Sequence, residues 1–101
     1  MNVGRAIRLC RSQKSMTQKD LAKSARISVS YLSLIEQNKR DPGISKIRDI
    51  AIALGIPVSI VFFLAAEDSE LSGLDSELIG RLASTALTFV HESSKADKTL
   101  I

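Results

Sequence analysis

The side chains best suited to contact another molecule lie in the stretch from residue 17 to residue 40. They comprise a neutral amide donor, two small hydroxyls and two cations: Gln18, Ser30, Ser33, Lys39 and Arg40. Such groups bind phosphates and the hydrogen-bonding edges of DNA bases. The sequence offers no Ser/His/Asp or Cys/His set for nucleophilic catalysis, so this stretch favours recognition over bond-breaking chemistry.

The rest of the chain offers little for catalysis or metal binding. It contains one cysteine, Cys10, and one histidine, His91. A disulfide framework, a multi-cysteine zinc site and a histidine relay are therefore excluded within one chain. We expect no enzymatic activity, no cofactor and no metal. Cys10 is expected to be a buried small apolar residue, and His91 to favour the C-terminal end of the last helix.

Two short, capped helices must position the candidate side chains. In the first, over residues 17–25, the Thr17 hydroxyl can cap the N–H of Asp20, whose carboxylate can reach back to Thr17. The second, over residues 28–37, begins at the capping residue Ser28. The turn between the two helices is therefore very short.

The outer face of the second helix has the character of a base-reading surface. Because Leu32 and Ile35 point inward, the opposite face carries Val29, Ser30, Ser33, Leu34 and Gln37. The DNA major groove is about 12 Å wide and admits one such helix. The turn-rich residues 38–43 then predict a loop with basic side chains, which suits the phosphates at the wall of the groove.

The charge distribution agrees with a polyanion partner. Residues 1–50 carry eleven basic and four acidic side chains, a net charge of +7. Residues 51–101 carry three basic and seven acidic side chains, a net charge of −4. A basic half on a mildly charged chain points to nucleic acid, although a solvated lysine-rich surface has the same composition.

Helical periodicity predicts further helices over residues 2–13, 44–55, 57–66 and 75–91. The apolar run 50–66 has an alternative reading as a membrane span, whose lower limit is about 17 residues. Gly55 and Pro57 interrupt it and favour two short core helices with no membrane contact. Since the chain does not open with a leader-type segment, we expect a cytoplasmic location.

Several linked blocks resemble the helix-turn-helix domain of the lambda repressor and Cro class, also called the xenobiotic-response-element family. The blocks are Ile7-Arg8-x-x-Arg11, Thr17-Gln18-x-x-Leu21-Ala22, Ile27-Ser28, Ser30-Tyr31-Leu32-Ser33-x-Ile35-Glu36, Lys39-Arg40-x-Pro42 and Ile50-Ala51-x-Ala53-Leu54-Gly55-Ile56. The resemblance covers about residues 2–65. It implies an all-α fold in which five helices form a compact DNA-binding domain over residues 1–66 and the third helix lies in the groove.

The resemblance also implies roles for individual residues. Those that face base edges would be Val29, Ser30, Ser33 and Leu34, the last at a position where the family more often has a polar or basic residue. Those that contact phosphates would be Gln18, with Lys19 beside it, and the loop residues Asn38, Lys39 and Arg40. Tyr31 would donate to a phosphate or pack on the preceding helix. Arg11 and Glu36 match a structural pair that ties the first helix to the end of the third.

Two positions depart from the family pattern. Arg26 and Ser15 stand where helix-ending glycines are usual. At Arg26 this predicts a positive φ, which is costly for a residue with a side chain, or a contact from Arg26 to a phosphate.

Residues 67–101 lie beyond the resemblance. We expect a linker near 68–72, an apolar helix over 75–91 and a frayed tail over 93–101. Leu71, Leu74, Leu78, Leu82, Ala86 and Phe89 form one apolar stripe. We expect it to hold a homodimer through Phe62, Leu78, Leu82 and Phe89, since one helix-turn-helix makes few base contacts. The alternative is that the helix packs on its own domain and covers Ile60, Phe62 or Phe63.

Together these features predict a homodimeric, sequence-specific transcriptional regulator that binds double-stranded DNA at a two-fold operator. A restriction–modification controller protein and the antitoxin of a toxin–antitoxin pair are alternatives on the same fold. A protein-interaction adaptor that uses the apolar C-terminal helix is an alternative of another class. Salt dependence separates them, because phosphate contacts weaken steeply as the salt concentration rises and an apolar interface does not.

Overall fold

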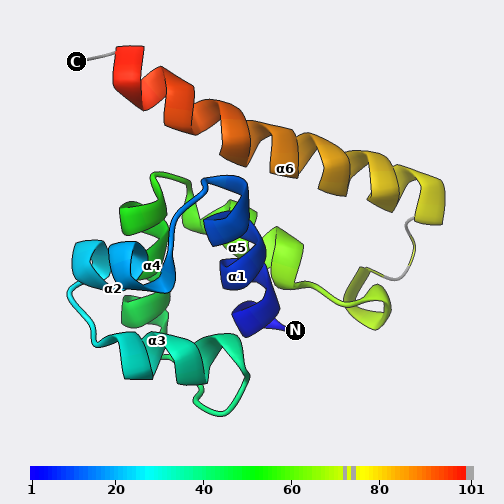
Figure 1. Ribbon diagram of the computed structural model, residues 1–101. Coiled ribbons are helices and arrows are strands. Elements are labelled where there is room, and N and C mark those ends of the chain that lie inside the picture. Colours follow the sequence, from blue (N-terminus) through cyan, green and yellow to red (C-terminus); the bar gives the residue numbers. More distant parts are fainter. Residues whose placement is uncertain (72, 74, 100–101) are drawn as a thin grey trace.

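The computed structural model describes residues 1–71, 73 and 75–99, and its regular structure there is helical. The elements are α1 (Val3–Gln13), α2 (Gln18–Ala25), α3 (Val29–Glu36), α4 (Ile44–Leu54), α5 (Val58–Ala65), the 3-10 turn η1 (Asp68–Leu71) and α6 (Ser76–Thr99). Five short helices form a bundle and the longer α6 lies across it (Figure 1). The predicted all-α class and helix order are confirmed.

The C-terminal region differs from the prediction in two respects. Residues 68–71, expected to be a plain linker, form η1. Helix α6 continues to Thr99 instead of ending at His91, so residues 93–99 are helical and not frayed. The reason is local, because this segment contains no glycine or proline that would end a helix. Leu74 and residues 100–101 lie outside the described residues.

The core forms around α1, which contacts α3, α4, α5 and α6. Its inward residues Ala6, Ile7 and Cys10 are fully buried, together with Leu21 of α2 and Leu32 of α3. Burial raises the pKa of the Cys10 thiol to about 11, as expected for a cysteine that packs as a small apolar residue.

Side-chain caps fix where α2 and α3 begin. The Thr17 hydroxyl accepts from the Asp20 N–H at 3.0 Å, and the Asp20 carboxylate accepts from the Thr17 N–H at 3.1 Å. The backbone N–H of Thr17 thereby lowers the pKa of the Asp20 carboxyl. The Ser28 hydroxyl accepts from the Tyr31 N–H at 3.0 Å. Both predicted caps are confirmed, and they set the start of α3 four residues after α2 ends at Ala25.

Left-handed residues end the helices where the sequence lacks the usual glycine. Arg26 has φ 60° and ψ 42° at the end of α2, as predicted, and Ser15 has φ 55° after α1. Asn38 adopts φ 59° after α3, which the sequence did not predict. A side chain at such a backbone conformation costs about 1–2 kcal/mol, less for asparagine. The cost arises from the Cβ atom, so Arg26 and Ser15 both carry it.

We expect Arg26→Gly to stabilise the protein. Glycine removes the left-handed strain of about 1–2 kcal/mol and adds about 0.5–1 kcal/mol of unfolded-state entropy, so the net gain is about 0.5–1 kcal/mol. Urea unfolding at constant m value measures it. Ser24→Gly, within the helical part of α2, is the control and should be destabilising. A less stable Arg26→Gly variant would show that the arginine side chain makes contacts worth more than the strain.

Helix α6 packs one face against the bundle. Ala86 and Val90 are buried, and α6 contacts α1 and α5. The Nδ1 atom of His91 lies 3.3 Å from the carbonyl oxygen of Gln13, the last residue of α1. His91 therefore lies within α6, against the C-terminal end of α1, and not at the end of its own helix as expected. The face of α6 that carries Ala86 and Val90 therefore packs on its own chain, as the alternative prediction stated.

Within the described ranges no single helix is long and apolar enough to cross a membrane. Only α4 and α5 taken together reach that length and composition, and they are bent by 109° at their junction. The bend follows from Gly55, which ends α4 with φ 70°, and from Pro57, which precedes α5.

Candidate nucleic-acid interface

Helices α2 and α3 form a short two-helix unit with an outward face on α3. Val29 and Leu34 are exposed. An apolar side chain that packed within the protein would be buried, so these two residues face outward. Ser30 is exposed as well. The hydroxyl of Ser33 is half-buried and accepts from the Gln37 side-chain amide at 2.8 Å. The four predicted base-facing residues thus share one accessible face of α3.

Gln37 belongs to the same face, as predicted, although the sequence analysis gave it no role in base contact. Its side chain is exposed and holds the Ser33 hydroxyl, so the two act as one polar group. The signal was present in the sequence, since Ser33 and Gln37 are four residues apart and neighbours on a helix surface.

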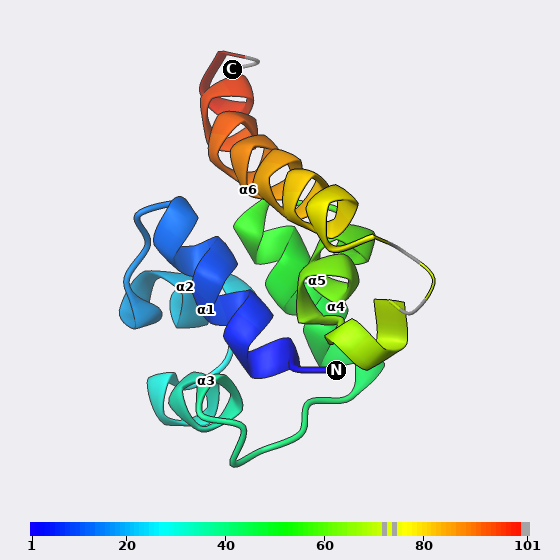
Figure 2. The same cartoon turned by 90° about the vertical axis from the view of Figure 1, so that its right-hand side faces the viewer.

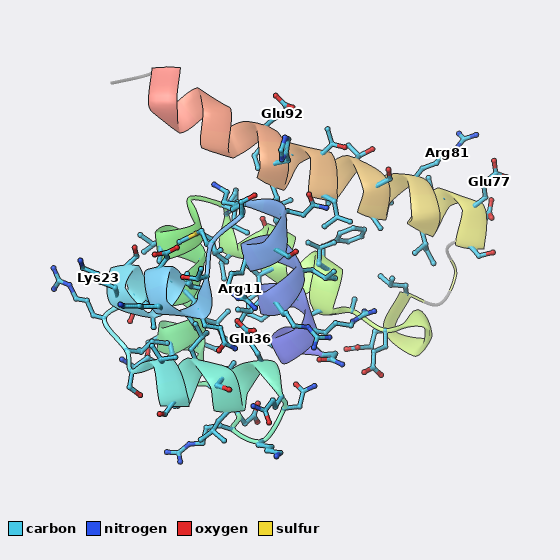
Figure 3. All side chains as sticks on the ribbon, in the orientation of Figure 1. Arg11, Lys23, Glu36, Glu77, Arg81 and Glu92 are labelled. Carbon is cyan, nitrogen blue, oxygen red and sulfur yellow. The ribbon has the colours of Figure 1, made fainter. Side chains whose placement is uncertain are left out.

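A buried carboxylate ties the unit to α1. Glu36, at the end of α3, accepts from Arg11 Nε at 2.8 Å and from Arg11 Nη2 at 2.9 Å. Arg11 Nη1 donates to the carbonyl of Met16 at 3.0 Å, and Gln18 Nε2 donates to Glu36 at 3.1 Å. Figure 3 shows Arg11 and Glu36 meeting between α1 and α3. The predicted structural pair of Arg11 and Glu36 is confirmed. Gln18, at the start of α2, is a third member of this network.

The basic loop follows α3 directly. Asn38, Lys39 and Arg40 are exposed, and the Arg40 guanidinium lies 5.7 Å from the centre of the Tyr31 ring. Tyr31 is half-buried against the core. Lys19, next to Gln18 in α2, is exposed. The candidate phosphate contacts therefore flank the outer face of α3 on α2 and on the loop.

A second accessible surface lies at the junction of α5 and α6. A hollow of about 410 Å³ is lined by Ile60, Phe63, Leu82, Thr85, Ala86 and Phe89. We call it the α5/α6 groove. Of the four predicted dimer residues, Leu82 and Phe89 line it, Leu78 is exposed nearby on α6, and Phe62 is half-buried against the core. Helix α6 lies on the side of the bundle away from α3 in both views (Figures 1 and 2).

Comparisons with known proteins agree with this geometry. Over 61 residues the chain is 41% identical to the immunity repressor protein of Bacillus phage phi105, covering 60% of this chain and 42% of the repressor. Over 65 residues it is 35% identical to the transcriptional regulator ClgR of Mycobacterium tuberculosis, covering 64% of this chain and 58% of ClgR. These matches span less than two thirds of the curated relatives.

The structure is also similar to the crystal structure of the clp gene regulator ClgR from C. glutamicum. The TM-score is 0.63 at 28% sequence identity, over 73% of this chain and 92% of that chain. The helix-turn-helix family matches residues 6–61, which is more than half of the chain and includes α2, α3 and the basic loop. The chain therefore belongs to the helix-turn-helix family, among its lambda-repressor-like members.

Proposed function

We propose that this chain is a sequence-specific, DNA-binding transcriptional regulator that inserts α3 into the major groove. The observation that carries the proposal is the exposed face of α3, set between the exposed Lys19 of α2 and the exposed basic loop. Phosphate contacts fix the register of a helix on the duplex, and base contacts supply the specificity. The phage repressor and ClgR relatives support the same activity.

The composition of the α3 face predicts what sequence it prefers. Val29 and Leu34 are apolar and exposed, and apolar side chains contact the methyl group of thymine. Ser30 and the Ser33–Gln37 pair supply the hydrogen-bonding groups. We therefore expect A·T pairs in each half-site.

We further propose that the chain binds its operator as a homodimer through the α5/α6 groove. Leu78, Leu82, Thr85 and Phe89 follow one another at spacings of four, three and four residues, the spacing at which one helix packs along another. This exposed face lies beside the one that buries Val90, and Ala86 lies at the boundary between them. Two copies would therefore cover Leu82 and Phe89 while each α6 stays on its own bundle.

The position of the groove leaves the α3 face free in a two-fold complex with DNA, because α6 lies on the side of the bundle away from α3 (Figures 1 and 2). The α5/α6 groove is at a junction of two helices and includes α5 residues Ile60 and Phe63. Half-sites would be about 34 Å apart, one turn of the duplex.

Selection of bound sites from a random duplex library tests the proposal, followed by titration of the selected site over a salt series. An enriched inverted repeat with half-sites one helical turn apart supports both DNA recognition and the dimer. Enrichment of a lone half-site contradicts the dimer. Weak binding to every sequence contradicts specific recognition and favours a protein-interaction adaptor.

Two pairs of variants separate the phosphate-contacting groups from the base-reading face. Gln18→Ala with Lys39→Ala should weaken binding to all duplexes about equally and reduce the salt slope by about 1, because Lys39 is the one cation removed. Ser30→Ala and Ser33→Ala should instead change the preference between sites, by about 1–3 kcal/mol at the base pair concerned. The measurement is the Kd for the selected site and for single-base variants at three salt concentrations. A uniform loss in the serine variants would mean that α3 does not read bases through this face.

A further inference from the structure

The loop that carries Lys39 and Arg40, residues 37–43, has little packing behind it. Residues 37–41 are all exposed. A hollow of about 700 Å³ separates the loop from the first turn of α1. The backbone bonds from Asn38 N to Ile35 O, 3.0 Å, and from Lys39 N to Leu34 O, 2.9 Å, only close the end of α3. The Arg40 guanidinium lies over the Tyr31 ring, but apolar burial does not hold the backbone of the loop in place.

A side-chain bridge crosses this hollow. Asn38 Nδ2 donates to Asn2 Oδ1 at 2.9 Å. Among the described residues it is the hydrogen bond that joins the loop to an element other than α3 and α4. Asn38 is also the left-handed residue at which the chain leaves α3. The bridge thus acts at the point that sets the direction of the loop.

Asn2 is itself held from two other directions. Its Oδ1 atom accepts from the Arg5 N–H at 3.0 Å and so caps α1. Its backbone N–H donates to the carbonyl of Ala65, at the end of α5, at 2.7 Å. Because Asn2 is fixed to α1 and α5, its bond to Asn38 transmits a fixed position to the loop.

The close approach of α1 to the loop depends on Gly4. A Cβ atom on this residue would collide with the carbonyl oxygen of Ile35 and lie 2.6 Å from Asn38 Oδ1. Gly4 therefore lets the first turn of α1 come near enough for Asn2 to reach Asn38. Asn2 is the N-cap of α1, a position at which asparagine is common.

We propose that Asn2 is a positioning residue for DNA binding: through Asn38 it holds the loop so that Lys39 and Arg40 face the phosphates before DNA arrives. The inference rests on the proposed function of the loop as a phosphate contact. A loop that is ordered in advance loses less conformational entropy on binding than a free one. Loss of the bridge should raise the Kd about 10-fold, the effect of about one hydrogen bond.

Two substitutions break the bridge without removing its neighbours. Asn2→Ser keeps a hydroxyl that can cap α1 but is too short to reach Asn38. Asn38→Gly removes the amide and accepts the positive φ without strain. Each should raise the Kd for the selected operator by at least about 10-fold, and Asn38→Gly should raise it more because it also removes a candidate phosphate contact. The double variant should be no worse than Asn38→Gly alone, because the bridge is then already broken.

The decisive readout is the dependence on the cations. In a Lys39→Ala/Arg40→Ala background the loop has no cation to position, so Asn2→Ser should leave the Kd unchanged. A merely structural role would lower the Tm and weaken binding equally in both backgrounds, which would overturn the inference. The inference would also be overturned if the wild type binds with a steep salt dependence and Asn2→Ser leaves the Kd unaltered. Absence of salt-dependent binding by the wild type would overturn the proposed function and the inference with it.

Discussion

Replacing Glu36 by alanine should destabilise the protein by about 3–5 kcal/mol, the cost of breaking a buried ion pair from one side. The Glu36 side chain is 2% exposed and accepts from both Arg11 and Gln18, so its removal leaves a guanidinium and an amide without their acceptor. For a chain of this size the Tm should fall by at least about 12 °C. Urea and thermal unfolding measure the loss.

Glu77→Ala is the matched control. Glu77 also pairs with an arginine, Arg81, at 3.1 Å, but its side chain is 74% exposed (Figure 3). Exposed pairs of this spacing contribute about 0.3–0.5 kcal/mol. A Glu36→Ala variant within 1 kcal/mol of the control would mean that the network does not hold α3 to α1. Replacing Arg11 and Glu36 together by leucine should recover part of the loss, since no charge is then left buried.

Replacing Leu82 and Phe89 together by serine should produce a monomer and weaken binding to the full operator by at least about 100-fold. Two linked modules gain a factor of about 10²–10⁴ over one module, and the monomer forfeits it. The buried Ala86 and Val90 are untouched, so the circular dichroism should remain close to that of the wild type, and the Tm should fall only by the stability that dimer formation contributes. Analytical ultracentrifugation and titration of full and half operators test both parts.

Ile52→Ser on α4 supplies the control for loss of an exposed apolar side chain. Ile52 is 75% exposed, whereas Leu82 and Phe89 are 41% and 46% exposed, and it lies outside the α5/α6 groove. This variant should remain dimeric with an unaltered Kd. A double serine variant that sediments as a dimer would contradict the proposed interface. A monomeric wild type at micromolar concentration would contradict the homodimer itself.

Local signals predicted most of the fold because each acts within a few residues. The Thr17 and Ser28 caps mark where α2 and α3 begin, and Gly55 marks where α4 ends. The positive φ of Arg26 followed from the missing glycine alone. The end of α6 was less predictable, since a polar segment without glycine or proline can be helical or not, depending on its neighbours.

The parts of the site that escaped prediction depend on contacts between distant segments. The Gln18 side chain reaches Glu36 and the Asn38 side chain reaches Asn2, pairs that are 18 and 36 residues apart. No periodicity or spacing reveals such pairs, because the packing of α1 against α3 creates them. The sequence likewise did not determine which face of α6 packs on its own bundle. A second apolar stripe, formed by Ile79, Ala83, Leu87 and Val90, lies beside the first on this helix.

Because Cys10 is buried, the reaction of its thiol reports when α1 separates from the core. With a pKa of about 11, the thiol is about one part in a thousand thiolate at pH 8, and it has no solvent exposure. Alkylation must therefore wait until α1 separates from the core, so its rate follows the free energy of that opening. Because Cys10 is unreactive, a cysteine introduced on the surface would be the thiol to which a fluorophore attaches. Ser30, on the outer face of α3, is one such position.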